Sequence, residues 1–387
     1  PPRPAGVAPP MSRMASTGDA GGADCTFVNE RQRGIPDIER TAGEAADLPI
    51  DKVRAFTAEA FTRAGMLPED ADTVAGNFLW ADLRGVDTHG VQRLPWYLKW
   101  FEDGICNPAA QVEVLRERPT MLSADGHHGL GQNVATRFMQ KLIPKAKDAG
   151  MCVGVIRNSN DWGCGGWYPH LASQAGLACV ATTTSIPNLA PFGARTRLYG
   201  NNPIAFAFPR RNDPPVLLDM ALTPVALGKV LRAQAEGTQL PAEWGFKDRD
   251  GNPTTDPAVA MKGIIPAIGG YKGTGLAMIT NILAGVLSGS AHSAQVEVGR
   301  RGQFFLLLDP DVIHPDGAEA YFDAMEDLVA QVRAVDVLPG EQVFLPGEPE
   351  QLRLEQRTAA GVIRYPASVI DGMRKVASRL GLPFDLA

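Results

Sequence analysis

The feature that most constrains the fold is a block of strands and turns between residues 177 and 221. Residues 177–183 and 216–221 are apolar runs of strand length, and glycine, asparagine and proline mark turns between them. Ser185 follows the first run, and Asp219 lies near the end of the second, where it either caps the next element or orients a catalytic group. Further short apolar runs alternate with segments of helical period, so the chain is predicted to contain both sheet and helices.

Composition excludes several classes of partner. The chain has 387 residues, is 44% hydrophobic and carries a net charge of -6, which suits a globular protein of two domains or one large interwoven domain and gives no basic footprint for nucleic acid. No apolar run reaches the ~18 residues of a membrane span, and no secretory signal is recognisable. Five scattered cysteines without a C-x-x-C pair suit reduced thiols and a cytoplasmic location. Residues 1–47 lack an apolar period and are predicted to be a loosely structured extension.

The densest group of chemically useful side chains lies between residues 81 and 95. Gly85 ends a predicted helix, and a turn with Thr88 and His89 follows. Arg93 comes four residues after His89, so a helical backbone from Gly90 onward would put both side chains on one face. Arg93 would then clamp a substrate carboxylate while His89 moves a proton. The plain alternative is a capping threonine, a packed histidine and a surface arginine.

Two glycine-rich turns precede predicted helices. GHHGLGQN, at 126–133, contains His127, which either lines a site or lies on the surface. GGYKGTG, at 269–275, contains Lys272 and Gly273 and is either an anion site or a plain helix entry. Neither turn has the G-x-G-x-x-G form, so no Rossmann fingerprint is predicted.

Six segments in order resemble the malate/L-lactate dehydrogenase family, whose members lack a Rossmann domain. They are RGVDTHGVQR, RNSNDWG, APFG, GNNPIAFAFP, GGYKGTG and LPGE. The resemblance runs from about residue 48 to the end of the chain. It implies an α/β fold with a non-Rossmann dinucleotide-binding domain at 126–308, built on a mainly antiparallel sheet. It also implies a discontinuous helical domain from 48–125 and 309–387, and a homodimer.

The resemblance further implies an oxidoreductase that moves a hydride between NAD or NADP and the carbon alpha to a carboxylate. The substrate would be a 2-oxo or 2-hydroxy acid, or a cyclic imine and its amino acid, in a specialised biosynthetic reductase. By resemblance His89 is the proton donor and acceptor, Thr88 and Asp219 orient it, and Arg93 holds the carboxylate. The cofactor contacts implied are Ser185, Met220, Ala221, Lys272, Gly273, Gly347 and Glu348. No metal site is expected. Arg195 or Arg197 meeting a phosphate would favour NADP slightly.

Asp161 is the main departure from the family pattern, because it stands where the family has a histidine. An ionised Asp161 would hold a substrate iminium, and a protonated one would replace the imidazole as acid; a third reading leaves the chemistry to His89 alone. We expect a C=N substrate on this basis, with Asp161 catalytic and with Trp162 and His127 touching the substrate. The loop after Gly289 is also shorter than in the family. The alternative function is a member that has lost hydride transfer and performs a non-redox acid/base step or binds a small carboxylate metabolite.

Overall fold

A seven-stranded sheet forms the centre of the fold. The computed structural model describes residues 45–296 and 300–386. The sheet has the order β2-β3-β4-β8-β5-β6-β7. Its strands are β2 (Glu113–Arg118), β3 (Met121–Asp125), β4 (Met151–Ser159), β5 (Ala178–Thr183), β6 (Ile204–Phe208), β7 (Val216–Met220) and β8 (Arg301–Leu308). Only the β3–β4 pair is parallel. The predicted mainly antiparallel sheet is therefore confirmed.

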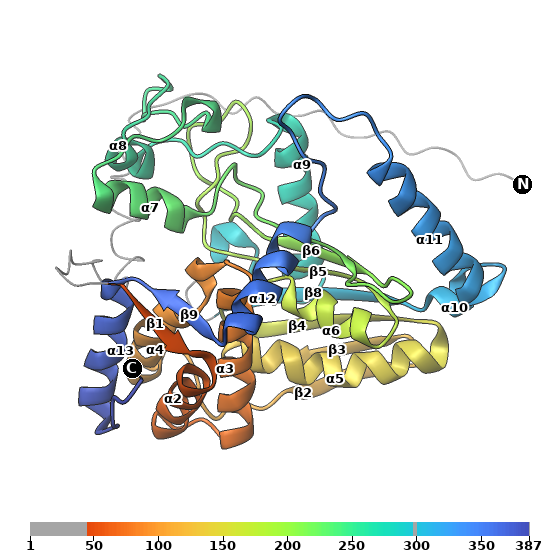
Figure 1. Cartoon of the computed structure of the whole chain (residues 1–387), viewed down its shortest axis with the longest axis horizontal. Coiled ribbons are helices and arrows are strands. Elements are labelled where there is room, and N and C mark those ends of the chain that lie inside the picture. Colours follow the sequence, from red (N-terminus) through yellow and green to blue (C-terminus); the bar gives the residue numbers. More distant parts are fainter. Residues whose placement is uncertain (1–44, 297–299, 387) are drawn as a thin grey trace, which may run out of the picture. The chain divides into compact units, whose positions relative to one another are not determined.

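Helices cover both faces of this sheet (Figure 1). On one face lie α5 (Gly131–Ala149) and α6 (Trp167–Gln174), and their apolar side chains share a core with Ile156 and Phe305 of the strands. On the other face, α9 (Tyr271–Thr280) continues into a π-helical turn, η4 (Asn281–Val286), which packs Ala284 against Phe304. Phe304 and Phe305 point to opposite faces because successive strand residues alternate.

Segments from both ends of the described residues build a second, helical core. The helices α2 (Ile50–Arg63), α3 (Pro68–Leu83), α4 (Leu94–Glu102) and α13 (Ala367–Leu380) surround a two-stranded sheet of β1 (Ala46–Pro49) and β9 (Val362–Tyr365). Phe61, Phe78 and Tyr97 from the first part share this core with Ile363 and Met373 from the last part. The helical region is thus discontinuous in sequence, as the resemblance implies.

The other helices lie around these two cores. They are α7 (Leu227–Glu236), α8 (Pro257–Lys262), α10 (Pro310–Ile313), α11 (Gly317–Arg333) and α12 (Glu348–Ala360), with short 3-10 turns η1 (Asp87–His89), η2 (Val91–Arg93), η3 (Ala242–Trp244) and η5 (Ser293–Gln295). Among the helices of the described residues, none combines the length and the apolar character needed to cross a bilayer.

Two of the expected domain boundaries can be compared with the observed elements. The expected domain boundary at 125/126 falls after β2 and β3, which the structure places in the large sheet. The expected N-terminal extension lies outside the described residues except for its last three, two of which are in β1.

The apolar spacing of α11 suggests a core face, but only Val329 is buried there, and Leu328 is 57% exposed. Ion pairs tether this helix instead, including that of Glu326 with Arg210.

Candidate active site

The turn that carries His89 is stabilised by a buried carboxylate, that of Asp82. Helix α3 ends at Leu83, and the chain turns through η1 and η2 before α4 begins. The carboxylate of Asp82 accepts hydrogen bonds from the Val91 amide at 3.0 Å and the Tyr365 hydroxyl at 2.8 Å. A Cβ atom on Gly90 would lie 1.7 Å from Asp82 Oδ1, so only glycine fits there. Asp82 and Tyr365 therefore fix the backbone that presents His89.

His89 is half-buried between a hydroxyl and two cations. Its Nδ1 lies 3.0 Å from Thr88 Oγ1, and Arg93 Nε donates to the Thr88 carbonyl at 2.6 Å. Burial lowers the pKa of His89 to about 3, with help from the charges of Arg93 and Arg301, while Asp161 opposes the change. The imidazole is therefore neutral at pH 7 in the free protein. Thr88, His89 and Arg93 lie together as predicted, and after Gly90 the backbone is helical, as a 3-10 turn that leads directly into α4.

Asp161 joins this group but is fully occupied. Its Oδ1 accepts from the Tyr97 hydroxyl at 2.8 Å and the Gly163 amide at 2.9 Å. Its Oδ2 lies 3.0 Å from Arg301 Nη1 and 3.5 Å from Arg93 Nη1. Burial opposes ionisation, yet the two guanidinium groups hold the pKa of this carboxyl well below its usual range.

This arrangement argues against two of the three roles considered for Asp161, the protonated acid and the partner of an iminium. A carboxylate whose pKa is so depressed does not act as a protonated acid near neutral pH. An iminium would have to approach Asp161 past two guanidinium groups, which repel it. These two cations do not favour the expected C=N substrate, which stays a prediction.

Arg301 is the residue that sequence reasoning missed. It is the first residue of β8, and its side chain is only 11% exposed. Its Nε is buried and has no hydrogen-bond partner among the described residues. The signal was present as two arginines directly before an apolar strand, but nothing in the sequence indicated that one of them turns inward.

Two predicted substrate contacts lie elsewhere. Trp162 is buried at 2% exposure and stacks on Tyr168, with ring centroids 5.0 Å apart, inside the core under α5. His127 lies on an exposed turn, where its Nε2 is 2.8 Å from Glu113 Oε2. Neither bonds to the group around His89 in the described part of the chain. Trp162 is apolar and faces the core, and His127 has a surface carboxylate as its partner.

Asp219 does not contact His89, contrary to expectation. Its Oδ2 accepts from the Gly166 amide at 2.7 Å and lies 3.4 Å from the Cys164 thiol. The predicted cofactor residue Gly347 lies beside the same strand, because the Leu217 amide donates to the Pro346 carbonyl at 3.0 Å. A Cβ on Gly347 would be 2.4 Å from the Leu217 carbonyl oxygen. In the described part of the chain, the side chain of His89 instead has Thr88 as its hydrogen-bond partner.

Glu348, also expected at the cofactor, is engaged within the protein. One carboxylate oxygen pairs with Arg333 at 2.5 Å, and the other accepts from the Leu345 amide at 2.7 Å. The arrangement closes the turn that starts α12.

Ser185 lies in a buried polar network next to the His89 group. Its hydroxyl donates to Asn201 Oδ1 at 2.7 Å, and its amide donates to Asn202 Oδ1 at 3.0 Å. The preceding residue, Thr184, exchanges two hydrogen bonds of 3.0 Å with Gly302, the neighbour of Arg301. The start of β8 therefore connects the two groups of polar residues.

The predicted cofactor residue Met220 ends β7 beside this network, and Ala221 follows it. The Leu222 amide, which follows them, donates to the Asn201 carbonyl at 2.8 Å. Met220 packs with the apolar residues beneath. Their position next to Ser185 is consistent with a common binding surface.

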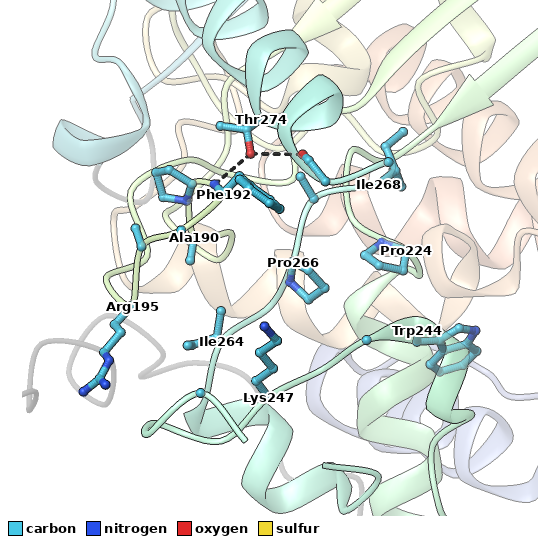
Figure 2. A pocket seen from close by; sticks show the side chains of 18 of the residues that line it. Ala190, Phe192, Arg195, Pro224, Trp244, Lys247, Ile264, Pro266, Ile268 and Thr274 are labelled. Atoms are coloured by element: carbon cyan, nitrogen blue, oxygen red, sulfur yellow. Dashed lines mark hydrogen bonds between the residues drawn. The ribbon is translucent and has the colours of Figure 1, made fainter. Parts of the chain in front are cut away.

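A cavity of about 660 Å³ opens between two loops, 190–195 and 264–270 (Figure 2). The hydroxyl of Thr274 joins the loops, because it accepts from the Phe192 amide at 2.9 Å and donates to the Gly270 carbonyl at 3.2 Å. Figure 2 shows Lys247 rising toward the cavity and Arg195 extending away from its rim. Arg197 is bound to backbone carbonyls of Met261 and Gly263, which removes it as a phosphate ligand.

Helix α9 begins beside this cavity, at Tyr271, five residues earlier than predicted. Lys272 is exposed in its first turn. A Cβ on Gly273 would lie 1.9 Å from the Ile268 carbonyl oxygen, so glycine lets the helix start pack closely on the loop. The cavity has the size of a ligand site. A helix start with an exposed lysine and a second lysine inside suits phosphate groups, so the residues present fit a dinucleotide.

The fold and this site define an oxidoreductase of the non-Rossmann type. Residues 48–374 match the profile of the family described as malate/L-lactate dehydrogenase. The chain belongs to this malate/L-lactate dehydrogenase family.

Individual relatives agree with this assignment. The chain is 35% identical to a malate dehydrogenase of Pyrococcus horikoshii over 87% of its own length and 96% of the relative. Its structure resembles that of the sulfolactate dehydrogenase from Methanocaldococcus jannaschii, with a TM-score of 0.81 and 30% identity over 87% of this chain and 98% of that one. It also resembles the delta1-piperideine-2-carboxylate reductase from Pseudomonas syringae pvar. tomato, with a TM-score of 0.78 and 28% identity over 86% and 100% of the two chains.

Proposed function

We propose that the protein is an NAD(P)-dependent oxidoreductase that interconverts a 2-oxo acid and the corresponding 2-hydroxy acid. The observation that carries the proposal is the group of Thr88, His89 and Arg93, which places a proton-transfer residue beside a guanidinium group. The link between Thr184 and Gly302 brings this group next to Ser185 and the predicted cofactor surface. Relatives that act on malate and sulfolactate support the same class of substrate.

In this proposal each residue of the group has one task. Arg93 binds the substrate carboxylate and so places the neighbouring carbon in a defined position. His89 Nε2 gives a proton to the carbonyl oxygen during reduction and takes it from the hydroxyl during oxidation. Thr88 Oγ1, 3.0 Å from Nδ1, fixes the ring orientation. The nicotinamide, when bound, supplies or accepts the hydride.

The dinucleotide is proposed to bind along Ser185, Met220, Ala221, Lys272 and Gly273, with the cavity of Figure 2 taking up part of it. The lean toward NADP now rests on Lys247 inside the cavity and Arg195 at its rim, because Arg197 is engaged. Gly347 and Glu348 are proposed to contact the cofactor only through the turn before α12, since the Glu348 carboxylate already has protein partners.

We also propose that the protein is a homodimer. Six large apolar side chains on α9, η4 and the residue after them are exposed: Tyr271, Met278, Ile279, Ile282, Val286 and Leu287. An apolar face of this kind on a globular protein marks an interface. It continues directly from Lys272, so a second copy seated there would lie beside the cofactor surface.

Location and metabolic role stay predictions. Four cysteines, Cys106, Cys152, Cys164 and Cys179, are free and buried in the described residues, which suits a reducing compartment such as the cytoplasm. The role as a specialised biosynthetic reductase rests on Asp161, Trp162, Trp167, the shortened loop after Gly289 and the N-terminal extension.

The proposal is tested by titrating the protein with NADH and with NADPH while following nicotinamide fluorescence. We expect micromolar binding, and consumption of the reduced cofactor when 2-oxo acids are added. Lys272→Met should weaken binding of both cofactors by about tenfold, because it removes a cation from a helix start. Lys262→Met is the matched control, since Lys262 is an exposed lysine outside the cavity.

The variant Lys247→Met distinguishes the binding of NADPH from the binding of NADH. If the cavity receives the extra phosphate of NADP, this variant loses affinity for NADPH and keeps its affinity for NADH. Equal losses would place the lysine elsewhere along the dinucleotide. Absence of binding to either nucleotide would overturn the oxidoreductase and favour the alternative, a non-redox acid/base enzyme or a carboxylate-binding protein.

A further inference from the structure

The charges around His89 do not balance. Arg93 and Arg301 both approach the single carboxylate of Asp161, at 3.5 Å and 3.0 Å. All three side chains are less than 20% exposed, so water screens them little. Because His89 is neutral, this group carries a net charge of one positive unit.

The two oxygens of Asp161 are already shared among four donors. Tyr97 and Gly163 take one oxygen, and the two arginines take the other. Asp161 therefore cancels one guanidinium charge without offering a free acceptor to a ligand. It acts on a substrate through its charge rather than through a hydrogen bond.

Arg301 retains unused hydrogen-bonding capacity beside this carboxylate. Among the described residues only its Nη1 has a partner, and its Nε is buried without one. A buried guanidinium nitrogen without an acceptor is costly. Its neighbour Gly302 bonds to Thr184, so Arg301 lies at the junction with the proposed cofactor surface.

We propose that Asp161 and Arg301 together set the site around His89 for a 2-oxo or 2-hydroxy acid with a single negative charge and against one with two. A monoanion neutralises the net positive charge of this group, whereas a dianion leaves one uncompensated negative charge near the poorly exposed carboxylate of Asp161. This inference rests on the proposed function, because it concerns the substrate of the same site. It distinguishes the chain from relatives named for malate and sulfolactate.

Oxamate and oxalate test this inference, because they are nearly isosteric and differ by one charge at neutral pH. Their affinities are measured by calorimetry on the NADH or NADPH complex of the full chain. We expect the unaltered protein to bind oxamate more tightly than oxalate. In Asp161→Asn, the ratio of oxalate to oxamate affinity should rise at least about tenfold, since the charges of Arg93 and Arg301 are then no longer offset by a carboxylate.

Arg301→Gln removes a positive charge, whereas Asp161→Asn removes a negative one. It therefore tests the inference even if Asp161→Asn does not fold. Removing this cation should weaken both ligands, and oxalate more than oxamate, while Arg301→Lys restores part of the loss. Arg300→Gln is the matched control, because Arg300 is the exposed neighbour in the chain. It should leave both affinities unchanged.

The outcomes separate the inference from the function. Tighter binding of oxalate by the unaltered protein, or an unchanged ratio in Asp161→Asn, overturns the charge inference while 2-oxo acid reduction continues. Failure of the protein to bind either reduced nucleotide overturns the proposed function, and the inference falls with it. Parallel turnover with pyruvate and oxaloacetate should show the same preference for the monoanion as the binding data.

Discussion

At the scale of single residues, the protonation state of His89 in the free protein is expected to control the rate of each direction of the proposed reaction. Burial and two nearby guanidinium groups lower its pKa to about 3. A neutral imidazole is ready to accept a proton from a hydroxyl, so oxidation needs no prior protonation. Reduction needs a proton on both ring nitrogens, and that form is scarce near neutral pH.

The pH dependence of kcat/KM tests this assignment, because kcat/KM reports the free enzyme. For reduction, kcat/KM should fall about tenfold per pH unit between pH 5 and 8, since the whole range lies above the pKa of His89. For oxidation it should stay nearly level over the same range. His89→Gln should lose about 10²- to 10⁴-fold of turnover and abolish the slope. A plateau for reduction below pH 7 would contradict the low pKa.

Sequence reasoning succeeded at this scale where partners are close in the chain. Thr88, His89 and Arg93 lie within six positions, so local geometry alone brings them together. Asp161 and Arg301 are 140 positions apart, and their contact depends on the register of β4 and β8. No local pattern contains that register, which explains why Arg301 was missed.

At the scale of elements, the His89 turn depends on the end of α3. The buried carboxyl of Asp82 receives the Val91 amide and the Tyr365 hydroxyl, and it leaves no room for a side chain at Gly90. Burial raises the pKa of Asp82 to about 7, against the opposing effect of the hydrogen bond from Val91. The folded protein therefore holds a proton here that the unfolded chain releases at lower pH.

This raised pKa makes stability depend on pH. Between about pH 4 and pH 7 the folded state binds more protons at Asp82, so the contribution of Asp82 to the free energy of unfolding falls as pH rises. Urea unfolding at pH 5 and pH 7 should show Asp82→Asn gaining about 2 to 3 kcal/mol relative to the unaltered protein over this interval. A constant difference between the two proteins at both pH values would show that Asp82 is ionised throughout.

The apolar periodicity of the sequence predicts whether a segment is a helix or a strand, but it predicts less well what packs against that segment. The paired helices before residue 83 and the strands of the sheet follow their apolar spacing. Trp162 shows the limit, because it follows a site residue in sequence yet points into the core. In α11 the apolar spacing is real, but Leu328 stays exposed. Periodicity identifies an apolar face and does not identify what covers it.

At the scale of the whole molecule, the proposed dimer and the active site are connected through one helix. The exposed apolar residues of α9 and η4 follow Lys272 along the same helical segment. Ala284 of that segment packs on Phe304 in β8, the strand that begins with Arg301. Without a second copy, this apolar face would be exposed on the same helical segment that packs against β8, the strand that begins with Arg301.

Charged residues on this face should separate the copies. Met278→Lys combined with Ile282→Glu should convert the dimer to a monomer in light scattering, because the charges would be buried in the interface. We expect cofactor affinity and turnover to fall with dissociation. Leu115→Lys, at a similarly exposed apolar position on β2, is the control and should leave the assembly unchanged. A monomeric unaltered protein would contradict the proposed homodimer.

The junction at the start of β8 has an evolutionary consequence. Arg301 contributes its side chain to the charge group around His89, and the backbone of the next residue, Gly302, holds Thr184 beside the predicted cofactor surface. If the two proposals hold, substrate choice and nucleotide affinity depend on two adjacent residues of one strand. A change that shifts this strand alters both traits at once. Lineages that acquire a new substrate are expected to change side chains there while keeping the strand register intact.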